Sequence, residues 1–274
     1  MIANRRISLF RLAALLFGFA FLYLPIVLLV VYSFNASRLV TVWGGWSTRW
    51  YTALLDNEKY RDAALTSLEI AVMAASIALV LGTCAGFAMN RFGRFRGRLV
   101  FGFMLIAPLV VPEVILGLSL LLLFVAVQNF IGWPASRGIA TVTIAHATFT
   151  ACFVAVLVRA QLSLFDRTLE EAALDLGARP ASVLWRITIP GISPALVSGW
   201  LLAFTMSLDD IVVASFVSGP SATTLPMAVY SSVRIGVTPE VNALATVFLG
   251  VVFVMVAAAG WLMARQERRR LAAT

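Results

Sequence analysis

Four carboxylates inside long apolar stretches are the residues best suited to chemistry: Glu69, Glu113, Asp209 and Asp210. An ionised side chain in hydrocarbon costs about 2.5 to 3.5 kcal/mol, so such residues rarely face lipid. The apolar stretches carry arginine only at their ends, and the carboxylates therefore lack fixed countercharges. An acidic cavity of this kind suits a mobile cation, and a proton, a metal ion and an organic ammonium group all fit the pattern.

Structural alternatives remain open for these side chains. Hydrogen bonds or charge pairs could lock neighbouring helices together without any substrate. Glu69 lies near the end of its stretch, where water could solvate it, whereas Glu113 follows Pro112 and the aspartate pair lies well inside. His146 is the one histidine of the sequence. We interpret it as a hydrogen-bonded packing residue on an apolar helix in preference to a proton relay.

Aromatic side chains crowd the segment after the first apolar stretch: Trp43, Trp46, Trp50 and Tyr51. Rings at a membrane surface commonly anchor a protein at the interface. A second interpretation is that Trp50 offers its ring face to an alkylammonium group, through a cation–π contact of roughly 0.5 to 2 kcal/mol. Aromatic rings together with carboxylates favour an organic cation over a bare metal ion.

The composition excludes a water-soluble globular protein. Apolar residues make up 61% of the 274 residues and charged residues only 12%, so most of the surface must face lipid or other helices. The stretches long enough to cross a bilayer as helices are about 10–33, 63–89, 99–127, 139–158, 192–217 and 243–264. We therefore predict an all-α integral membrane protein with a single transmembrane domain over residues 1–274.

Basic residues set the predicted orientation, because arginine and lysine remain in short cytoplasmic loops. Clusters precede the first stretch, follow the second and follow the last. They comprise Arg5, Arg6, Arg11, Arg91, Arg94, Arg96, Arg98, Arg265, Arg268, Arg269 and Arg270. Both chain ends are therefore predicted to be cytoplasmic. The net charge of +8 is then a topology signal and gives no reason to expect a nucleic-acid partner.

Two stretches carry features beyond hydrophobicity. Pro108 and Pro112 predict a kink in the third stretch, because proline removes a backbone donor. A stripe of small residues suited to close helix packing runs along the fifth stretch, and Asp210 lies on it. The stripe consists of Gly199, Ala203, Ser207 and Ala214. The sequence contains no Gly-x-x-x-x-Gly-Lys-Ser/Thr phosphate loop, so nucleotide hydrolysis would require another subunit.

Residues 170–190 form the only long polar segment between two apolar stretches on the predicted cytoplasmic side. The pattern predicts a helix that ends at Gly177, a turn, and a second helix that stops at Pro190. Such a two-helix knob would offer a docking surface to a soluble partner. It resembles the EAA loop of permease subunits in binding-protein-dependent ABC transporters. The matching residues are Glu171, Ala172, Ala173, Gly177, Ile187 and Pro190, and only Ile189, where the family favours Leu, departs from it.

Shorter motifs along nearly the whole chain resemble polyamine permeases. They are Ser-Thr-Arg-Trp-Tyr at 47–51, Arg-Phe-Arg-Gly at 94–97, Pro-Glu at 112–113, Ser-Leu-Asp-Asp at 207–210, Phe-Val-Ser-Gly-Pro at 216–220, Thr-Leu-Pro at 224–226 and Val-Thr-Pro-Glu-Val-Asn-Ala-Leu-Ala-Thr at 237–246. The sequence is most similar to putrescine-type inner-membrane permeases, and the spermidine-type permeases are near relatives.

The resemblance implies the fold of a type I ABC importer permease, with six transmembrane helices and a cytoplasmic two-helix EAA coupling loop over about 159–191. It implies a polyamine path lined by Trp50, Glu113, Ser207, Asp209 and Asp210, with Glu69 as a weaker candidate. It also implies that the ATPase is contacted by Glu171, Ala172, Ala173, Gly177, Ile187 and Pro190.

The same resemblance implies a complex in the bacterial inner membrane that imports polyamines from the periplasm by alternating access. The expected partners are a dimer of ATP-binding subunits, a periplasmic polyamine-binding protein, membrane lipid and a second permease. A paralogue is favoured over a second copy of this chain for that second permease. ATP and Mg would bind the ATPase, so this chain is expected to bind no cofactor and to have no enzymatic activity.

Two other classes of function are compatible with the carboxylates. A secondary transporter or cation channel could bind its driving ion at Glu113, Asp209 and Asp210, although the first half of the chain holds no second copy of the Ser207–Asp210 motif. A membrane-embedded enzyme could use the aspartate pair as acid and base. Adjacent residues on a helix point about 100° apart, however, and do not readily share one substrate atom.

Overall fold

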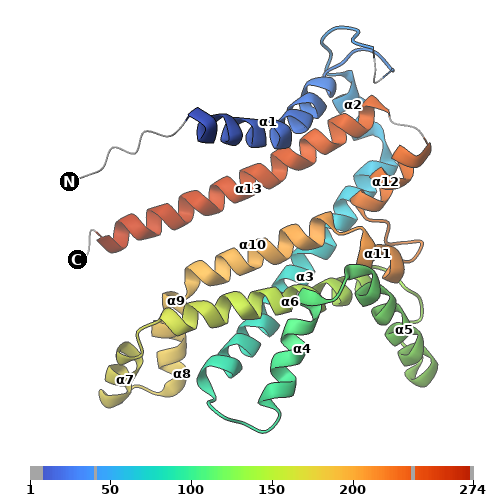
Figure 1. The fold of residues 1–274 in the computed structure, drawn as a ribbon. Coiled ribbons are helices and arrows are strands. Elements are labelled where there is room, and N and C mark those ends of the chain that lie inside the picture. The colour runs from blue at the N-terminus through green and yellow to red at the C-terminus, as the bar shows by residue number, and fades with distance from the viewer. Residues whose placement is uncertain (1–8, 40–41, 236–237, 272–274) are drawn as a thin grey trace. The chain divides into compact units, whose positions relative to one another are not determined.

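The computed structural model describes residues 9–39, 42–235 and 238–271; Arg5 and Arg6 of the predicted N-terminal basic cluster lie outside them. The described chain is helical (Figure 1), and its extended pairing is a single bridge between Asn35 and Trp46. The helices are α1 (Leu9–Tyr32), α2 (Arg49–Asp56), α3 (Glu58–Arg91), α4 (Arg98–Val110), α5 (Glu113–Ile131), α6 (Ile139–Leu164), α7 (Thr168–Asp175), α8 (Pro180–Val183), the π turn η1 (Leu184–Thr188), α9 (Ile189–Gly191), α10 (Ser193–Asp209), α11 (Val212–Val217), α12 (Leu225–Ile235) and α13 (Pro239–Leu271). The predicted all-α class is confirmed.

Several of these helices are long and apolar enough to cross a membrane. Five qualify singly within the described residues: Phe10–Tyr32, Glu58–Arg91, Glu113–Ile131, Ile139–Leu164 and Pro239–Ala258. A sixth span results when the helical run Pro180–Gly191 and the helix Ser193–Asp209, which meet at 68°, are counted together.

The chain forms two compact units. Residues 9–61 together with Val229–Phe253 make up the first, and Asp62–Ala228 together with residues 254–271 make up the second. Three helices, α3, α12 and α13, contribute to both units. The predicted carboxylates and the predicted cytoplasmic knob all belong to the second unit.

In the first unit, Asn35 organises the segment between α1 and α2. Its amide nitrogen donates to the carbonyl of Val42 (2.8 Å), and its side-chain oxygen accepts from the amides of Ser37 (3.1 Å) and Gly44 (2.8 Å). The indole N–H of Trp50 donates to the Asn35 carbonyl at 2.6 Å. Because Asn35 is fully buried, these bonds replace the water it lost and fix Trp50 at the start of α2.

Helix α6 is the central element of the second unit. A β-carbon on Gly82 of α3 would lie 2.6 Å from Val154 of α6, and one on Gly86 would lie 2.8 Å from the carbonyl of Ala155. Gly199 of α10 also approaches Val154, where an added β-carbon would lie 3.3 Å from a side-chain methyl group. The predicted stripe of small residues is therefore a packing surface, because it lets α10 lie close to α6.

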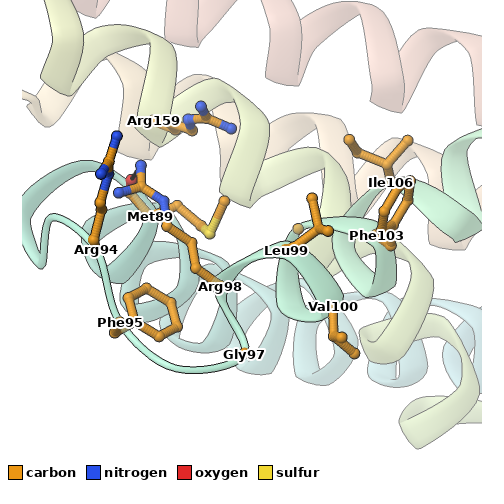
Figure 2. Close-up of a pocket in the computed structure, with 11 residues that line it drawn as sticks. Met89, Arg94, Phe95, Gly97, Arg98, Leu99, Val100, Phe103, Ile106 and Arg159 are labelled. Carbon is orange, nitrogen blue, oxygen red and sulfur yellow. Dashed lines mark hydrogen bonds between the residues drawn. The ribbon is translucent and has the colours of Figure 1, made fainter.

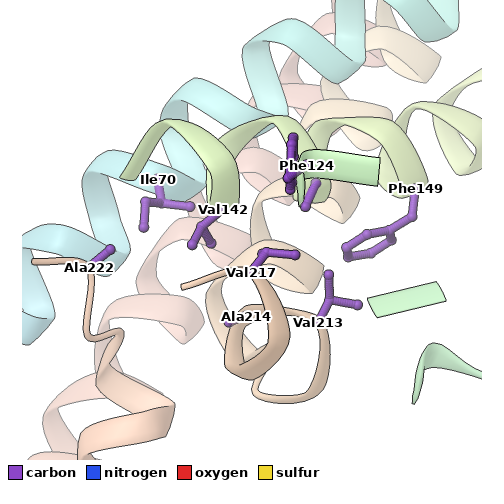
Figure 3. Close-up of a cluster of buried hydrophobic side chains, with 9 residues drawn as sticks. Ile70, Phe124, Val142, Phe149, Val213, Ala214, Val217 and Ala222 are labelled. Atoms are coloured by element: carbon purple, nitrogen blue, oxygen red, sulfur yellow. The ribbon is translucent and has the colours of Figure 1, made fainter. Parts of the chain in front are cut away.

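A cluster of buried apolar side chains joins α3, α5, α6 and α11 (Figure 3). It consists of Ile70, Phe124, Val142, Ala145, Phe149, Val213, Ala214, Val217 and Ala222. Three of the six residues of α11 belong to this cluster. Their burial explains how so short a helix keeps its position. This packing holds the end of α10 and the start of α11 against α6.

The sequence predicted one kinked helix over the third apolar stretch, 99–127, whereas the structure has two separate helices there. Helix α4 ends at Val110, Val111 is extended (φ −71°, ψ 133°), and α5 begins at Glu113. Proline disfavours helical geometry in the residue before it and has no N–H to continue the helix. Pro112 therefore ends one helix and begins another, and Glu113 becomes a first-turn residue.

The fifth predicted stretch, 192–217, is also interrupted. Helix α10 ends at Asp209, and Asp210 has extended geometry (φ −67°, ψ 126°) before α11 begins at Val212. The break carries neither glycine nor proline, so helix propensity gave no signal for it. The side chain of Asp210, described below, supplies the physical reason.

Candidate functional site

Asp210 lies in the break between α10 and α11 and is almost fully buried, with 9% of its surface exposed. Its Oδ1 accepts from the amide of Val213 (3.3 Å), and its Oδ2 accepts from the amide of Ala214 (2.7 Å). The same Oδ2 lies 3.1 Å from Nε2 of His146 on α6. The carboxylate thus replaces the missing helical acceptors at the start of α11, which is why the break forms there.

His146 connects α6 to both sides of the break. Its Nδ1 lies 2.7 Å from Oγ of Ser207 on α10, and the ring is fully buried. The two ring nitrogens of His146 thus each contact one side of the break, Nδ1 the Ser207 hydroxyl at the end of α10 and Nε2 the carboxylate of Asp210. The interpretation of His146 as a hydrogen-bonded packing residue is confirmed. It also gives Asp210 the basic partner that the sequence analysis did not identify.

Asp209 is the last residue of α10, and its side chain is exposed. Its carboxylate lies within electrostatic reach of Asp210, Glu113 and His146. Glu113 is exposed as well and opens α5. A β-carbon on Gly117 would lie only 2.7 Å from the ring of Phe216, so α5 packs tightly on α11. This contact brings the start of α5 to the break.

The structure therefore brings together Glu113, Ser207, Asp209 and Asp210 at the junction of α5, α6, α10 and α11. Asp210 and Ser207 are engaged in bonds within the chain, whereas Asp209 and Glu113 present open carboxylates. Two neighbouring carboxylates repel each other, and a cation between them relieves that repulsion. Within residues 9–39, 42–235 and 238–271, no three His, Cys, Asp or Glu side chains gather closely enough to hold a metal ion.

The two remaining predicted path residues lie elsewhere in the chain. Glu69 is exposed on α3 and is not among the charged groups that interact with Asp209. Trp50 belongs to the first unit, where the guanidinium carbon of Arg49 stands 4.1 Å from the centroid of its ring. One face of the indole is thus already covered by a cation of the protein itself.

The predicted cytoplasmic knob consists of α7 followed by the helical run from α8 to α9. Gly177 has φ +84°, its amide donates to the carbonyl of Leu174 (2.9 Å), and the amide of Ala178 donates to the carbonyl of Ala173 (3.0 Å). These paired bonds form a Schellman motif, which needs a left-handed residue at its centre. The predicted helix end at Gly177 is therefore correct, and glycine is required there because other residues are strained at positive φ.

The second helix of the knob differs slightly from the expectation, since it runs through Pro190 to Gly191 before the 68° bend into α10. Pro190 has no amide hydrogen to donate to the preceding turn. The turn before it widens into η1, where the amide of Ile189 donates to the carbonyl of Leu184. At the other end of the knob, the amide of Thr168 donates to Asp166 at 3.0 Å and lowers the pKa of that carboxyl.

Glu170 holds the knob together, a role that the sequence analysis did not assign. Its Oε1 accepts from the guanidinium of Arg91 at the end of α3 (2.9 Å) and from the hydroxyl of Thr188 in η1 (2.6 Å). Its side chain is only 17% exposed, whereas neighbouring Glu171 is exposed. The available sequence signal was an arginine, Arg91, that follows the predicted span 63–89, and a carboxylate, Glu170, that directly precedes the EAA residues.

Apolar side chains protrude from the surface of the knob. Leu176 is 89% exposed and Trp185 is 69% exposed, and Leu169 and Leu174 are exposed beside them. Exposed apolar side chains grouped around polar residues mark an interaction surface. Glu171, Ala172 and Gly177 are also exposed, while Ala173 and Ile187 are half-buried.

Residues 78–271 match the protein family described as the inner membrane component of binding-protein-dependent transport systems. Two relatives from Escherichia coli (strain K12) cover nearly the whole chain. The putrescine transport system permease protein PotI is 58% identical over 96% of this chain and 94% of its own length. The spermidine/putrescine transport system permease protein PotC is 42% identical over 92% of each chain.

Solved structures with the same fold come from bacterial ABC transporters. One is a bacterial alginate ABC transporter in complex with an alginate pentasaccharide-bound periplasmic protein, with a TM-score of 0.69 at 18% identity over 93% of this chain and 92% of that one. Another is a MetNI methionine ABC transporter in inward-facing conformations, with a TM-score of 0.61 at 17% identity over 80% and 98%. At such identities these structures support the fold alone.

Proposed function

Because the chain belongs to the family of inner membrane components of binding-protein-dependent transport systems, we propose that it forms one half of the membrane path of an ATP-driven polyamine importer. The single observation that carries the proposal is the pair of open carboxylates, Asp209 and Glu113, at a helix break inside the apolar part of the chain. The putrescine permease that is 58% identical supports putrescine as the substrate.

The geometry suggests how such a path treats a diamine. An alkylammonium group entering the path loses water, and the carboxylates of Asp209 and Glu113 replace that hydration with charge-assisted hydrogen bonds. Asp210, Ser207 and His146 line the break but act mainly by holding it in place, since their polar atoms are already bonded. Weak, sequential binding of this kind lets the cation enter and also leave.

A second permease is required to complete the path. Asp209 and Glu113 are exposed on this chain, and their contact with lipid would cost about 2.5 to 3.5 kcal/mol for each charge. The face that carries them is therefore expected to lie against a second permease across a water-filled path. We favour a paralogue of this chain in that position.

Energy for transport would come from a separate pair of ATP-binding subunits, which carry the ATP and Mg. The exposed apolar surface of the knob, with Leu176 and Trp185 beside Glu171, would fill a groove of one ATPase subunit. Glu170, through Arg91 and Thr188, would transmit movement of the knob to α3 and to the bend before α10. A periplasmic binding protein would deliver the polyamine from the other side.

The proposed topology follows from the arginines. The arginine clusters that follow the apolar parts of α3 and α13 support a cytoplasmic location for these helix ends, and both chain ends would lie there as well. The chain would thus be a multi-pass protein of the bacterial inner membrane, with the knob on the cytoplasmic side.

The test is labelled-putrescine uptake into proteoliposomes that contain the complete complex. Uptake should require binding protein outside and ATP inside, and unlabelled spermidine should compete more strongly than a monoamine of equal length. Glu58→Gln is the control: it removes a carboxylate of α3 that is 83% exposed and should leave uptake unchanged. Equal uptake with and without ATP, driven by a cation gradient, would instead identify a secondary transporter.

A further inference from the structure

An open groove of about 780 Å³ lies beside the turn that joins α3 to α4 (Figure 2). Figure 2 shows the guanidinium groups of Arg94, Arg98 and Arg159 gathered at one end of it. Leu99, Phe103 and Ile106 extend along α4 away from that end. The groove therefore joins a basic end to an apolar channel, a combination that neither the path nor the knob explains.

The three arginines are not equivalent. Arg98 donates to the carbonyls of Met89 (2.9 Å) and Gly93, and thereby closes the turn. Within the part of the chain that the structure describes, no hydrogen bond or ion pair engages the guanidinium groups of Arg94 and Arg159. Two free cations that face one groove, with a third beside them, attract an anion. A phosphate group matches the bidentate geometry of arginine.

We propose that this groove binds an anionic phospholipid, with its phosphate between Arg94 and Arg159 and the first part of an acyl chain along Leu99, Phe103 and Ile106. Leu99 is 74% exposed and Phe103 is 65% exposed, so the apolar end of the groove opens toward the bilayer. The volume of the groove lies in the range of small-molecule sites and holds a headgroup with adjoining methylenes, not a whole lipid. The proposed topology places this end in the cytoplasmic leaflet, where anionic lipids attract basic residues.

The first experiment measures lipid retention by native mass spectrometry of the purified complex, titrated with dioleoylphosphatidylglycerol. Arg94→Gln and Arg159→Gln should each weaken binding about fivefold, because each basic residue near an anionic surface contributes ~1 kcal/mol. Arg96→Gln is the matched control, since Arg96 lies on the same turn but does not line the groove. Equal binding by the wild type and the Arg94→Gln/Arg159→Gln double variant would overturn the proposal.

Two further arms separate the possible ligands. Glycerol phosphate carries the headgroup chemistry without acyl chains, and dioleoylphosphatidylethanolamine carries the chains without net charge. Both should bind at least tenfold more weakly than phosphatidylglycerol; equal binding of glycerol phosphate would identify a free-phosphate site and overturn the lipid assignment. This readout does not depend on which substrate the complex transports.

A crosslinking experiment in cells tests whether a protein covers the groove instead. A benzoylphenylalanine placed at Phe103 should crosslink to phospholipid, and the adduct should diminish in the Arg94→Gln/Arg159→Gln background. A crosslink to the second permease or to an ATPase subunit would show that a protein surface occupies the groove, and the proposal would then be wrong.

Discussion

Asp209 and Asp210 at the helix break can be compared with Glu170 and Glu171 on the knob. In each pair, one carboxylate is engaged inside the chain: Asp210 contacts His146 and the amides of α11, and Glu170 contacts Arg91 and Thr188. The other member, Asp209 or Glu171, is exposed. Neighbouring acidic residues thus have opposite surroundings at both places.

Local backbone geometry separates the two side chains in each pair. On the knob, Glu170 and Glu171 are successive residues of α7, whose side chains point about 100° apart. At the break, Asp209 is the last residue of α10 and Asp210 is extended, so the chain changes direction between them. The inward residue fixes the local backbone, and the outward residue is left free for a ligand or a partner. We infer that positioning and binding are divided between adjacent residues in each pair.

The largest effect should follow from loss of the inward aspartate. Asp210→Ala leaves the backbone amides of Val213 and Ala214 and the buried ring of His146 without their hydrogen-bond partner, and each buried donor left unsatisfied costs about 1 to 3 kcal/mol. The complex should lose yield and thermal stability. Asp209→Ala is the control and should change stability by less than about 0.5 kcal/mol. Equal destabilisation by the two variants would remove the distinction between them.

The outward aspartate should govern transport. Asp209→Asn preserves size but removes the charge that meets an ammonium group, a charge-assisted contact of about 1.5 to 3 kcal/mol. Putrescine uptake should fall about tenfold to hundredfold, with assembly and basal ATPase activity unchanged. Glu113→Gln should act in the same direction. Undiminished uptake by the Asp209→Asn/Glu113→Gln double variant would exclude this pair as the cation site.

The knob allows the same separation between stability and function. Glu171→Lys reverses a charge on the exposed surface, so the ATPase should no longer copurify, while the melting temperature of the permease stays unchanged. Glu170→Ala leaves the guanidinium of Arg91 and the hydroxyl of Thr188 without their shared acceptor and should cost about 1 to 3 kcal/mol of stability. Both are checked by pull-down with the ATPase and by thermal unfolding. Normal copurification of Glu171→Lys would show that the ATPase docks elsewhere.

The smallest effect is expected at Trp50, because Arg49 already covers one face of its ring and its N–H is bonded to Asn35. Trp50→Leu should weaken uptake about fivefold if ~1 kcal/mol of cation–π attraction is lost. Trp50→Phe keeps an aromatic face and should recover part of that loss. If the Trp50→Leu variant transports putrescine as well as the wild type in an intact complex, Trp50 is an interfacial anchor.

The sequence by itself was sufficient for the helical membrane class, the helix end at Gly177 and the family. These depend on local or cumulative signals: apolar length, a glycine where φ must be positive, and motif spacing. Residue type also indicated that Asp209, Asp210 and Glu113 would avoid lipid, because the cost of a charge in hydrocarbon does not depend on the fold.

Only the tertiary structure decided how these residues divide their roles. The break at Asp210 contains no glycine or proline from which the sequence could predict it. It forms because one carboxylate is contacted both by His146, 64 positions earlier in the chain, and by the backbone amides of α11. The bond between Arg91 and Glu170 likewise joins residues 79 positions apart. Periodicity and propensity describe neighbours along one helix, whereas these contacts depend on which helices pack together, and that packing determined which carboxylate of each pair is engaged and which is open.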